Sequence, residues 1–469
     1  MHAETPQTEE GAVDVLSAFV AGIRYEDLPS PVALHARYVW LDTLGVILAG
    51  SAEGYVTQLA SQVARDDGSA RIIGGGCPHA DASSAALVNG TAGTVLELDE
   101  GHRPTGHPAI YVIPALLAAA EREASSGREL IASLVAGYEV GARLAAATAW
   151  RSDVHVHGAV GPAAAAAAVS HLSGGDERLI GKSIRVGVCL GIAAPFRAAF
   201  EGAYVRNTYA GIAGVLGLIS HELVRAGIAA YVEAATDVFG RILGTAFATD
   251  RLVVRTGEDF MIRTNYFKRH AACRYIHSTL DALALAVGAR RLTPTEIDHI
   301  RVVCDTNAAR CNRPDPPNEL AAKFSLPFAV ATRIVNGRSD AVAFRDEMTA
   351  DLDVRRVAAR VSVVATGATV TQEGWSAYPA SVEVWLTSGE RLTGQVLRPV
   401  GDQPVPIPYE DVEQKFVDLT MPVLKPGGGR KLMDVVLHLA DITVEELVAT
   451  IRDVGADGLQ MSTTQGGGT

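Results

Sequence analysis

Apolar residues in the first 270 positions recur with the spacing of an α-helix. In residues 31–49 they stand three or four positions apart, from Leu34 to Leu48, which places them on one face of a helix. Ala-rich segments with the same spacing predict further helices at 111–123, 130–147, 162–172, 211–226 and 274–287. Because small residues allow helices to approach closely, we expect residues 12–270 to form a tightly packed helical domain.

The pattern changes after Leu292, where apolar residues begin to alternate. Alternation at every second position is typical of strands. It predicts strands at 296–304, 360–365, 381–387 and 391–397, the last two joined as a hairpin, and residues 325–336 retain a helical pattern. A smaller α+β domain is therefore expected over residues 271–400.

Helical signals return beyond Gly401. Residues 409–419 and 430–439 have helical spacing, and Thr443 with Glu446 forms a capping box ahead of a further helix. We expect residues 401–454 to pack against the first domain. The fold class is then mainly α, with a large all-helical domain formed by both chain ends and a smaller inserted α+β domain, and with disordered ends at 1–11 and 455–469.

Charge and composition exclude several classes of protein. The 469 residues include 41 basic and 53 acidic side chains, a net charge of −12, which disfavours binding to nucleic acid or to an anionic membrane. Five cysteines without a C-x-x-C pair suggest a reducing compartment, and the acidic N-terminus lacks a signal peptide, so we expect a cytoplasmic protein. The longest uncharged stretch, 154–175, has an apolar core too short for a membrane span.

The segment 89–108 concentrates titratable side chains beside glycine and proline. Glu97, Asp99, His102 and His107 stand where a predicted helix runs into a loop. Such a loop would gather acids and imidazoles as proton transfer requires. The alternative is a solvated helix end with capping acids.

Two imidazoles stand two positions apart at His155 and His157. This spacing can bind zinc, but no nearby cysteine or acidic motif completes a ligand set. A helix cap or ordinary polar contacts are the alternatives. We therefore expect no metal.

Basic residues occur at two further places in this acidic chain. Arg206 precedes a glycine-bearing helix, where a cation and unpaired N–H groups would suit a carboxylate; the alternative is a surface arginine. Lys268 and Cys273 stand in or near the basic run 266–270 at the expected domain junction, where ligand clefts tend to form. The alternative for that run is an exposed charged surface.

Several motifs occur together in one order. They are LDTLGVILAG, TVLELDEGH followed by HPAIYVIPALLAAAE, GYEVGARL, H-x-HGAVGPAAAAAA, YFKRHAAC, KFSLPFAVA and PIPYEDVEQKF. From about residue 12 to about 450, this order and spacing resemble the MmgE/PrpD family, which contains dehydratases, decarboxylases and epimerases of small carboxylic acids. The resemblance implies a helical domain built from both chain ends, an inserted α+β domain, a homodimer, and an active site between the domains without metal or cofactor.

The resemblance also implies a set of active-site positions. They are Glu97, Gly101, His107, His155, Arg206, Lys268, Cys273 and Phe328. Four depart from the family pattern, which has Asp in place of Glu97, Thr in place of Gly101, Lys in place of Arg206 and Tyr in place of Phe328. Arginine does not readily donate a proton and phenylalanine has none to donate, so the chemistry of any leaving-group step is altered here.

The leading hypothesis is a cofactor-independent lyase, of dehydratase or decarboxylase type, for a small di- or tricarboxylic acid. His107, His155 and Lys268 would move protons next to a carboxylate. Residues expected to contact the substrate are Glu97, Asp99, His102, Arg206, Cys273 and Phe328. The alternatives are a dicarboxylate epimerase, which needs no protonated leaving group, and an inactive homologue that only binds its ligand.

Overall fold

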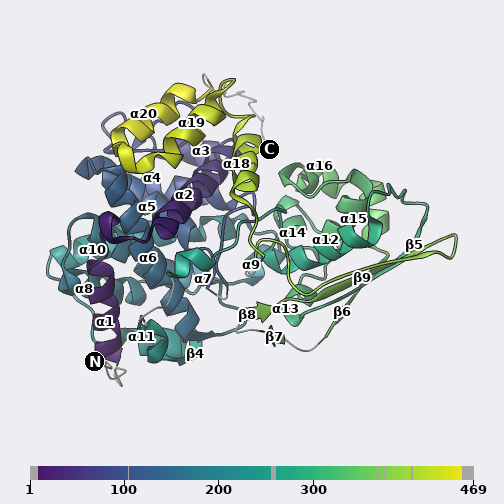
Figure 1. Ribbon diagram of the computed structural model, residues 1–469, viewed down its shortest axis with the longest axis horizontal. Helices are drawn as coiled ribbons and strands as arrows, with labels where there is room; N and C mark the ends of the chain where they lie inside the picture. Colours follow the sequence, from purple (N-terminus) through teal and green to yellow (C-terminus); the bar gives the residue numbers. More distant parts are fainter. Residues whose placement is uncertain are drawn as a thin grey trace, which may run out of the picture.

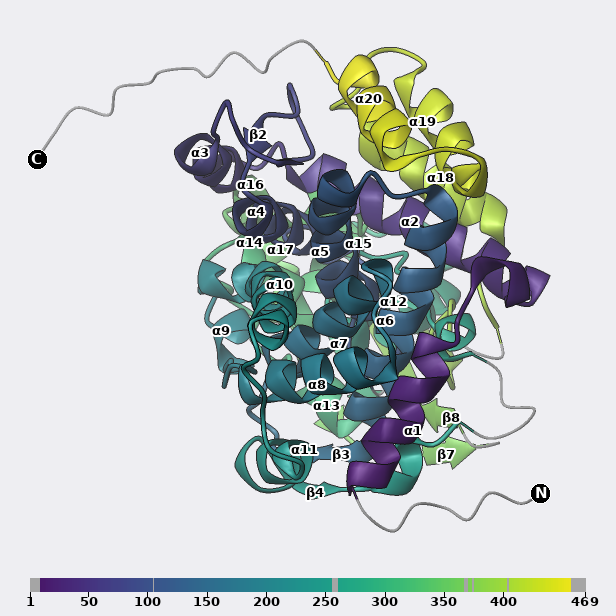
Figure 2. The same ribbon diagram turned by 90° about the vertical axis from the view of Figure 1, so that its left-hand side faces the viewer.

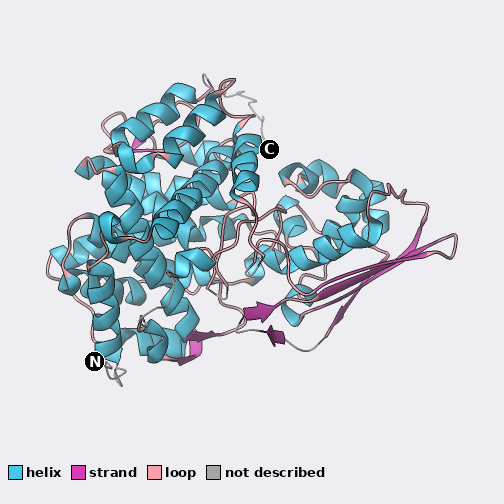
Figure 3. Cartoon of the chain, in the orientation of Figure 1, coloured by secondary structure: helices cyan, strands magenta, loops and turns pink. Residues whose placement is uncertain are grey.

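The computed structural model describes residues 9–103, 105–254, 260–366, 370–372, 375–402 and 405–456. The protein is mainly α with a smaller α+β region, as the sequence predicted (Figures 1 and 3). The first helix begins at Glu9, inside the segment expected to be disordered. The rest of that segment, and the tail from residue 457, lie outside the described residues.

The large helical part surrounds one central, almost fully buried helix, α7. It packs against α5, α6, α8 and α10 (Figure 2), and its run of six alanines at 163–168 permits these close contacts. The helices of this part are α1 (Glu9–Ala21), α2 (Ser30–Gly50), α3 (Gly54–Val63), α4 (Ala82–Thr94), α5 (Pro108–Glu123), α6 (Gly127–Ala147), α7 (Val156–Leu172), α8 (Glu177–Cys189), α9 (Arg197–Phe200), α10 (Tyr209–Arg225) and α11 (Ala234–Asp237).

Helices α4 and α10 touch backbone to backbone at Gly90 and Gly211. A Cβ on Gly90 would lie 2.5 Å from the Cα of Gly211, closer than side chains tolerate. This contact fixes the C-terminal end of α4 beside the turn η2 (Tyr204–Thr208) that leads into α10. The Thr94 hydroxyl then donates to the Asn207 carbonyl at 2.6 Å and joins the two segments.

Two short antiparallel strand pairs interrupt the helical part. They are β1 (Ala70–Arg71) with β2 (His79–Ala80), and β3 (Thr148–Trp150) with β4 (Gly244–Phe247). The sequence did not predict them, because strands of two to four residues are too short to set up a recognisable alternation.

The α+β region is built on a four-stranded sheet in the order β10-β9-β5-β6. Strand β6 is parallel to β5, whereas β9 is antiparallel to both β5 and β10. Helix α12 packs against β9 and β10. The elements are α12 (Arg274–Val287), β5 (Ile297–Cys304), α13 (Thr306–Ala309), α14 (Glu319–Lys323), α15 (Leu326–Asn336), α16 (Asp346–Thr349), α17 (Leu352–Ala358), β6 (Val361–Ala365), β7 (Val370–Gln372), β8 (Trp375–Ala377), β9 (Ala380–Leu386) and β10 (Arg391–Val396).

The C-terminal helices return to the helical part. They are α18 (Tyr409–Thr420), α19 (Gly428–Leu437) and α20 (Val444–Val454), and α18 lies along α2 (Figure 1). The rings of Tyr38 and Tyr409 stack there at 3.9 Å. Lys415 of α18 donates to the Asp42 carboxylate and to the Leu98 carbonyl, each at 2.6 Å, so the chain end also supports the loop after α4.

Two helices, α2 and α6, are long and apolar enough to span a membrane by length and composition. The sequence did not single them out for this property. Within the apolar window of each helix, 83% and 94% of the residues are buried inside the protein. This is the burial expected of core helices.

Candidate active site

The loop between α4 and α5, residues 95–107, carries the acidic and imidazole groups into the protein interior. Glu97, Asp99 and Glu100 are each about 1% exposed, which excludes a solvated helix end. The backbone of Glu97 has a φ of 53°, a left-handed conformation that residues other than glycine seldom adopt. Such conformations persist where the surrounding structure enforces them.

The Glu97 carboxylate pairs with two cations that come from distant segments. One oxygen contacts Arg206 of η2, and the other lies 3.0 Å from Nζ of Lys268. Burial alone would raise the pKa of Glu97, but the charges of Arg206 and Lys268 outweigh it and hold that pKa below its usual value. Both cations are at most 2% exposed, so neither is a surface charge.

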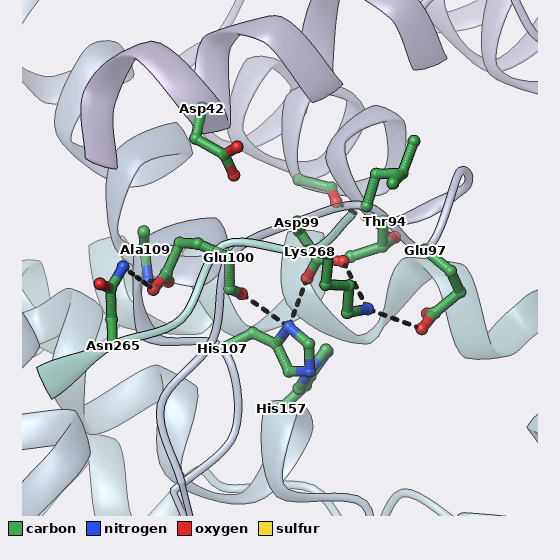
Figure 4. A network of polar contacts seen from close by, with 12 residues as sticks. Asp42, Thr94, Glu97, Asp99, Glu100, His107, Ala109, His157, Asn265 and Lys268 are labelled. Carbon is green, nitrogen blue, oxygen red and sulfur yellow. Dashed lines mark hydrogen bonds and ion pairs between the residues drawn. The ribbon is translucent and has the colours of Figure 1, made fainter. Parts of the chain in front are cut away.

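Asp99 connects Lys268 to His107 (Figure 4). One oxygen of Asp99 lies 3.5 Å from Lys268 Nζ, and the other lies 2.9 Å from His107 Nδ1. The same Nδ1 is 2.7 Å from the Glu100 carbonyl oxygen. Because both partners are acceptors, Nδ1 carries a proton, so in the neutral form of the ring the lone pair is on Nε2.

His155 has the opposite arrangement. It is the N-cap of α7, and its Nδ1 accepts a hydrogen bond of 3.4 Å from the backbone N–H of His157. The proton of the neutral ring therefore stands on Nε2. Burial, reinforced by Arg206, lowers the pKa of His155 well below its usual value, which keeps the ring neutral.

These groups meet at a cavity of about 190 Å³ between the helical part and the α+β region. That volume is small beside the roughly 300–1,000 Å³ of pockets for drug-sized ligands. The lining includes His107, His155 and Arg206 from the helical part. The other lining residues are Glu97, His102, Arg103, Gly106, Val156, His157, Phe196, Tyr266, Cys273, Arg274, Tyr275, Asn307, Phe324 and Tyr378.

Comparison with known proteins settles the family. Residues 14–250 match the MmgE/PrpD N-terminal domain, and residues 270–441 match the MmgE/PrpD C-terminal domain. The chain belongs to the MmgE/PrpD family. It is 24% identical to human cis-aconitate decarboxylase over 458 residues, 92% of each chain. It is 26% identical to a cis-aconitate decarboxylase-like protein of Aspergillus oryzae over 304 residues, 60% of this chain and 62% of the relative.

Most residues expected from the MmgE/PrpD motifs lie at this cavity or directly behind it. His102 lines it, but Thr105 and Thr264 occupy both of its ring nitrogens, at 2.8 and 2.7 Å. Burial lowers the pKa of His102 to about 4, so the ring is neutral. Cys273 also lines the cavity, whereas Lys268 reaches it through its partner Glu97.

Phe328 does not line the cavity. Its ring is fully buried and lies 6.1 Å from the ring of Phe344. The Ser325 hydroxyl caps the N-terminus of α15 through the Phe328 N–H, which fixes the start of this helix and the direction of the side chain. Phe328 is thus set back from the cavity, whereas Phe324 of the same motif lines it.

Several other residues that line the cavity were not among the active-site residues predicted from the sequence. His157 is 1% exposed, and neither of its ring nitrogens has a hydrogen-bond partner among the described residues. The guanidinium groups of Arg274, which is buried, and of Arg103, which is half-buried, also line the cavity. The sequence signal that could have pointed to these residues is their position, because each stands within two positions of His102, His155 or Cys273.

Gly101 is explained by Tyr266, which also lines the cavity. A Cβ on Gly101 would lie 2.4 Å from the Tyr266 hydroxyl oxygen. The two residues are joined by a backbone bridge, with the Tyr266 N–H donating to the Gly101 carbonyl at 2.7 Å. Threonine at this position would require the tyrosine ring to move.

Three side chains of the site, Asp99, His107 and His157, could by distance hold a metal ion. Each offers a ligand atom, and these atoms lie within 4.8 Å of one another. However, His107 already directs its Nδ1 at Asp99, and the Lys268 ammonium lies 3.5 Å from that carboxylate. A divalent cation would face electrostatic repulsion from Lys268, so the charges fit a carboxylate ligand better than a metal.

Proposed function

We propose that this MmgE/PrpD protein is a cofactor-independent lyase that removes a proton next to a carboxylate of a small di- or tricarboxylic acid. The observation that carries the proposal is a pair of imidazoles at one small cavity whose Nδ1 atoms face opposite partners, acceptors at His107 and a donor at His155. His107 presents a lone pair, and His155 presents an N–H. A base and an acid are thereby distinguished before any ligand binds.

His107 is the proposed base. Its Nε2 takes the proton from the carbon next to the substrate carboxylate, and the ring becomes an imidazolium. Asp99, 2.9 Å from Nδ1, stabilises that positive charge and holds the ring in place. Burial would raise the pKa of Asp99, but His107 and Lys268 more than offset this and keep it ionised.

The negative charge that develops on the substrate needs fixed cations nearby. Arg206 lines the cavity, and its Nε has no hydrogen-bond partner among the described residues. Lys268 adds a second positive charge behind Glu97. Preorganised charges in a buried site are worth more than the same charges in water. His155, through Nε2–H, then donates a proton to the leaving group or to the developing carbanion.

An epimerase remains the second candidate, and Arg206 favours it. Arginine does not readily donate a proton, and Phe328 cannot donate one. Return of the proton to the opposite face of the carbon needs only a base and an acid on two sides, which His107 and His155 could supply. An inactive homologue is the third candidate, although it would not need this proton arrangement.

Incubation in deuterated water tests these candidates together. The substrates would be a panel of di- and tricarboxylates that includes cis-aconitate, followed by NMR. A lyase forms an alkene or releases carbon dioxide. An epimerase incorporates deuterium at the carbon and inverts it without net cleavage. If no compound undergoes either change, the inactive homologue would be favoured.

The matched variants are H107N, which removes the base, and H299N at an exposed histidine of β5. The proposed function expects turnover to fall by about 10²- to 10⁴-fold in H107N and to persist in H299N. Wild-type turnover in H107N would contradict the assignment of the base.

A further inference from the structure

Two arginines, Arg274, which is buried, and Arg103, whose side chain is 13% exposed, form a second cationic group at the cavity. Nε of Arg103 lies 3.5 Å from one oxygen of Asp402, and Nη2 of Arg274 lies 2.5 Å from the other. Both arginines line the cavity, whereas Asp402 does not. We call Arg103 and Arg274 the distal arginine pair.

The distal arginine pair is held rigidly. The guanidinium carbon of Arg103 lies 3.3 Å from the centre of the Tyr378 ring, and that of Arg274 lies 4.2 Å from the centre of the Tyr266 ring. Nη2 of Arg103 donates to the Arg274 carbonyl at 3.2 Å. Stacked and hydrogen-bonded guanidinium groups lose little freedom when a ligand binds.

The hydrogen-bonding capacity of the pair is not used up. Nη1 of Arg103 and Nε of Arg274 are buried and have no acceptor among the residues that the structure describes. A buried donor without a partner is costly, so an anion in the cavity would stabilise both groups.

The local charge has the sign that an anion requires. Two guanidinium groups face one paired carboxylate, that of Asp402. The neighbouring imidazoles add no charge, because burial lowers the pKa of His102 to about 4 and that of His277 well below its usual value.

The pair stands apart from the groups assigned to proton transfer. Arg206 and Lys268 share Glu97, whereas Arg103 and Arg274 share Asp402. Tyr266 contacts both regions: its ring meets the His107 ring edge-on at 6.2 Å, and the guanidinium carbon of Arg274 lies 4.2 Å from its centre. A ligand at His107 therefore has a second cationic surface within the same cavity.

We propose that the distal arginine pair binds a second carboxylate of the substrate, remote from the carboxylate beside the reacting carbon. This inference rests on the proposed function and assigns the residues that hold the second carboxylate of its di- or tricarboxylic substrate. Arg103 is then a specificity-determining residue, because it selects such acids over monocarboxylates of the same length.

Calorimetric binding to the intact protein tests the proposal without requiring turnover. The probes are succinate and butyrate, which share a four-carbon chain and differ in the second carboxylate. Wild type is expected to bind succinate at least tenfold more tightly, which corresponds to about 1.4 kcal/mol. In R103Q the ratio of the two dissociation constants should fall to near one.

Two further variants serve as controls, one for misfolding of R103Q and one for the loss of a positive charge elsewhere on the protein. R103K keeps the charge but lacks the planar fork, so it should retain an intermediate ratio and remains usable if R103Q does not fold. R197Q removes one positive charge from an exposed side chain of α9 and should leave the ratio unchanged.

The outcomes separate this inference from the proposed function. Equal binding of succinate and butyrate to wild type, or an unchanged ratio in R103Q and R103K, would overturn the distal carboxylate site while leaving the lyase proposal in place. Tricarballylate, a tricarboxylate, serves as a further probe. If wild type binds none of the three acids, both the distal carboxylate site and the lyase proposal would be overturned.

Discussion

Asp99 and His107 form a buried carboxylate–imidazole pair, with 2.9 Å between the Asp99 oxygen and Nδ1 of His107. The pair fixes the proton of His107 on Nδ1, because the Asp99 carboxylate accepts a hydrogen bond from that atom. In the neutral ring, Nε2 is therefore the atom that can act as a base.

The first prediction concerns this pair. H107N should lower turnover by about 10²- to 10⁴-fold, the usual contribution of a positioned acid or base. D99N should also lower it, because the amide cannot stabilise the imidazolium and can reverse the preferred proton position. Activity would be measured by product formation or by deuterium exchange. Wild-type rates in D99N would show that the carboxylate plays no part.

A second prediction concerns the charges around Glu97. E97Q leaves two buried cations without their shared partner and should lower the free energy of unfolding by about 3–5 kcal/mol. R206Q should cost less, because Glu97 keeps Lys268. The double variant should be more stable than the sum of the two losses predicts, since R206Q removes the charge that E97Q leaves unpaired.

Urea unfolding of these three variants and wild type gives the double-mutant cycle. The exposed pair of Arg290 and Glu390 supplies the control, for which little change is expected. Strictly additive effects of E97Q and R206Q would contradict the buried coupling.

Glu100 gives a pH prediction. Burial raises its pKa to about 7, although the Ala109 N–H, the Tyr138 hydroxyl and the Asn265 amide all donate to it. The folded protein therefore binds a proton between pH 4.5 and 7 that the unfolded chain has released. Stability from this group is present below about pH 4.5 and is lost as the pH rises to 7, on the order of 3 kcal/mol.

Urea unfolding at pH 5 and pH 8 measures this loss. E100Q cannot ionise, so its stability should decline less than that of wild type over the same interval. Parallel declines in the two proteins would assign the pH dependence to other groups.

The fourth prediction contrasts two neighbouring histidines. H157L should leave the free energy of unfolding unchanged or higher, because both nitrogens of His157 are buried without partners. H155L removes the N-cap of α7 and should cost about 0.5–2 kcal/mol. If His157 serves a ligand, H157L should nevertheless weaken the binding of succinate. A destabilised H157L with normal binding would indicate a structural role.

The last prediction concerns metal. Because Lys268 and Arg206 surround Asp99 and Glu97, activity should withstand EDTA, and elemental analysis should find no stoichiometric metal. Turnover that EDTA abolishes and zinc restores would instead assign a metal to Asp99, His107 and His157.

The sequence determined the elements and the family because both depend on local order along the chain. The spacing of apolar residues predicted α2, and the alternation of apolar residues predicted β9. Motif spacing likewise predicted His107 and His155 as site residues, since each lies within a motif that resembles the MmgE/PrpD pattern.

Only the tertiary structure decided the chemistry of those residues. The proton positions of His107 and His155 follow from which acceptor or donor faces Nδ1 in the folded protein. Asp402 joins Arg103 and Arg274 across more than one hundred positions, and the start of α15 turns Phe328 into the core. Such contacts depend on how distant helices pack, and neither the spacing of apolar residues nor a local motif contains that information.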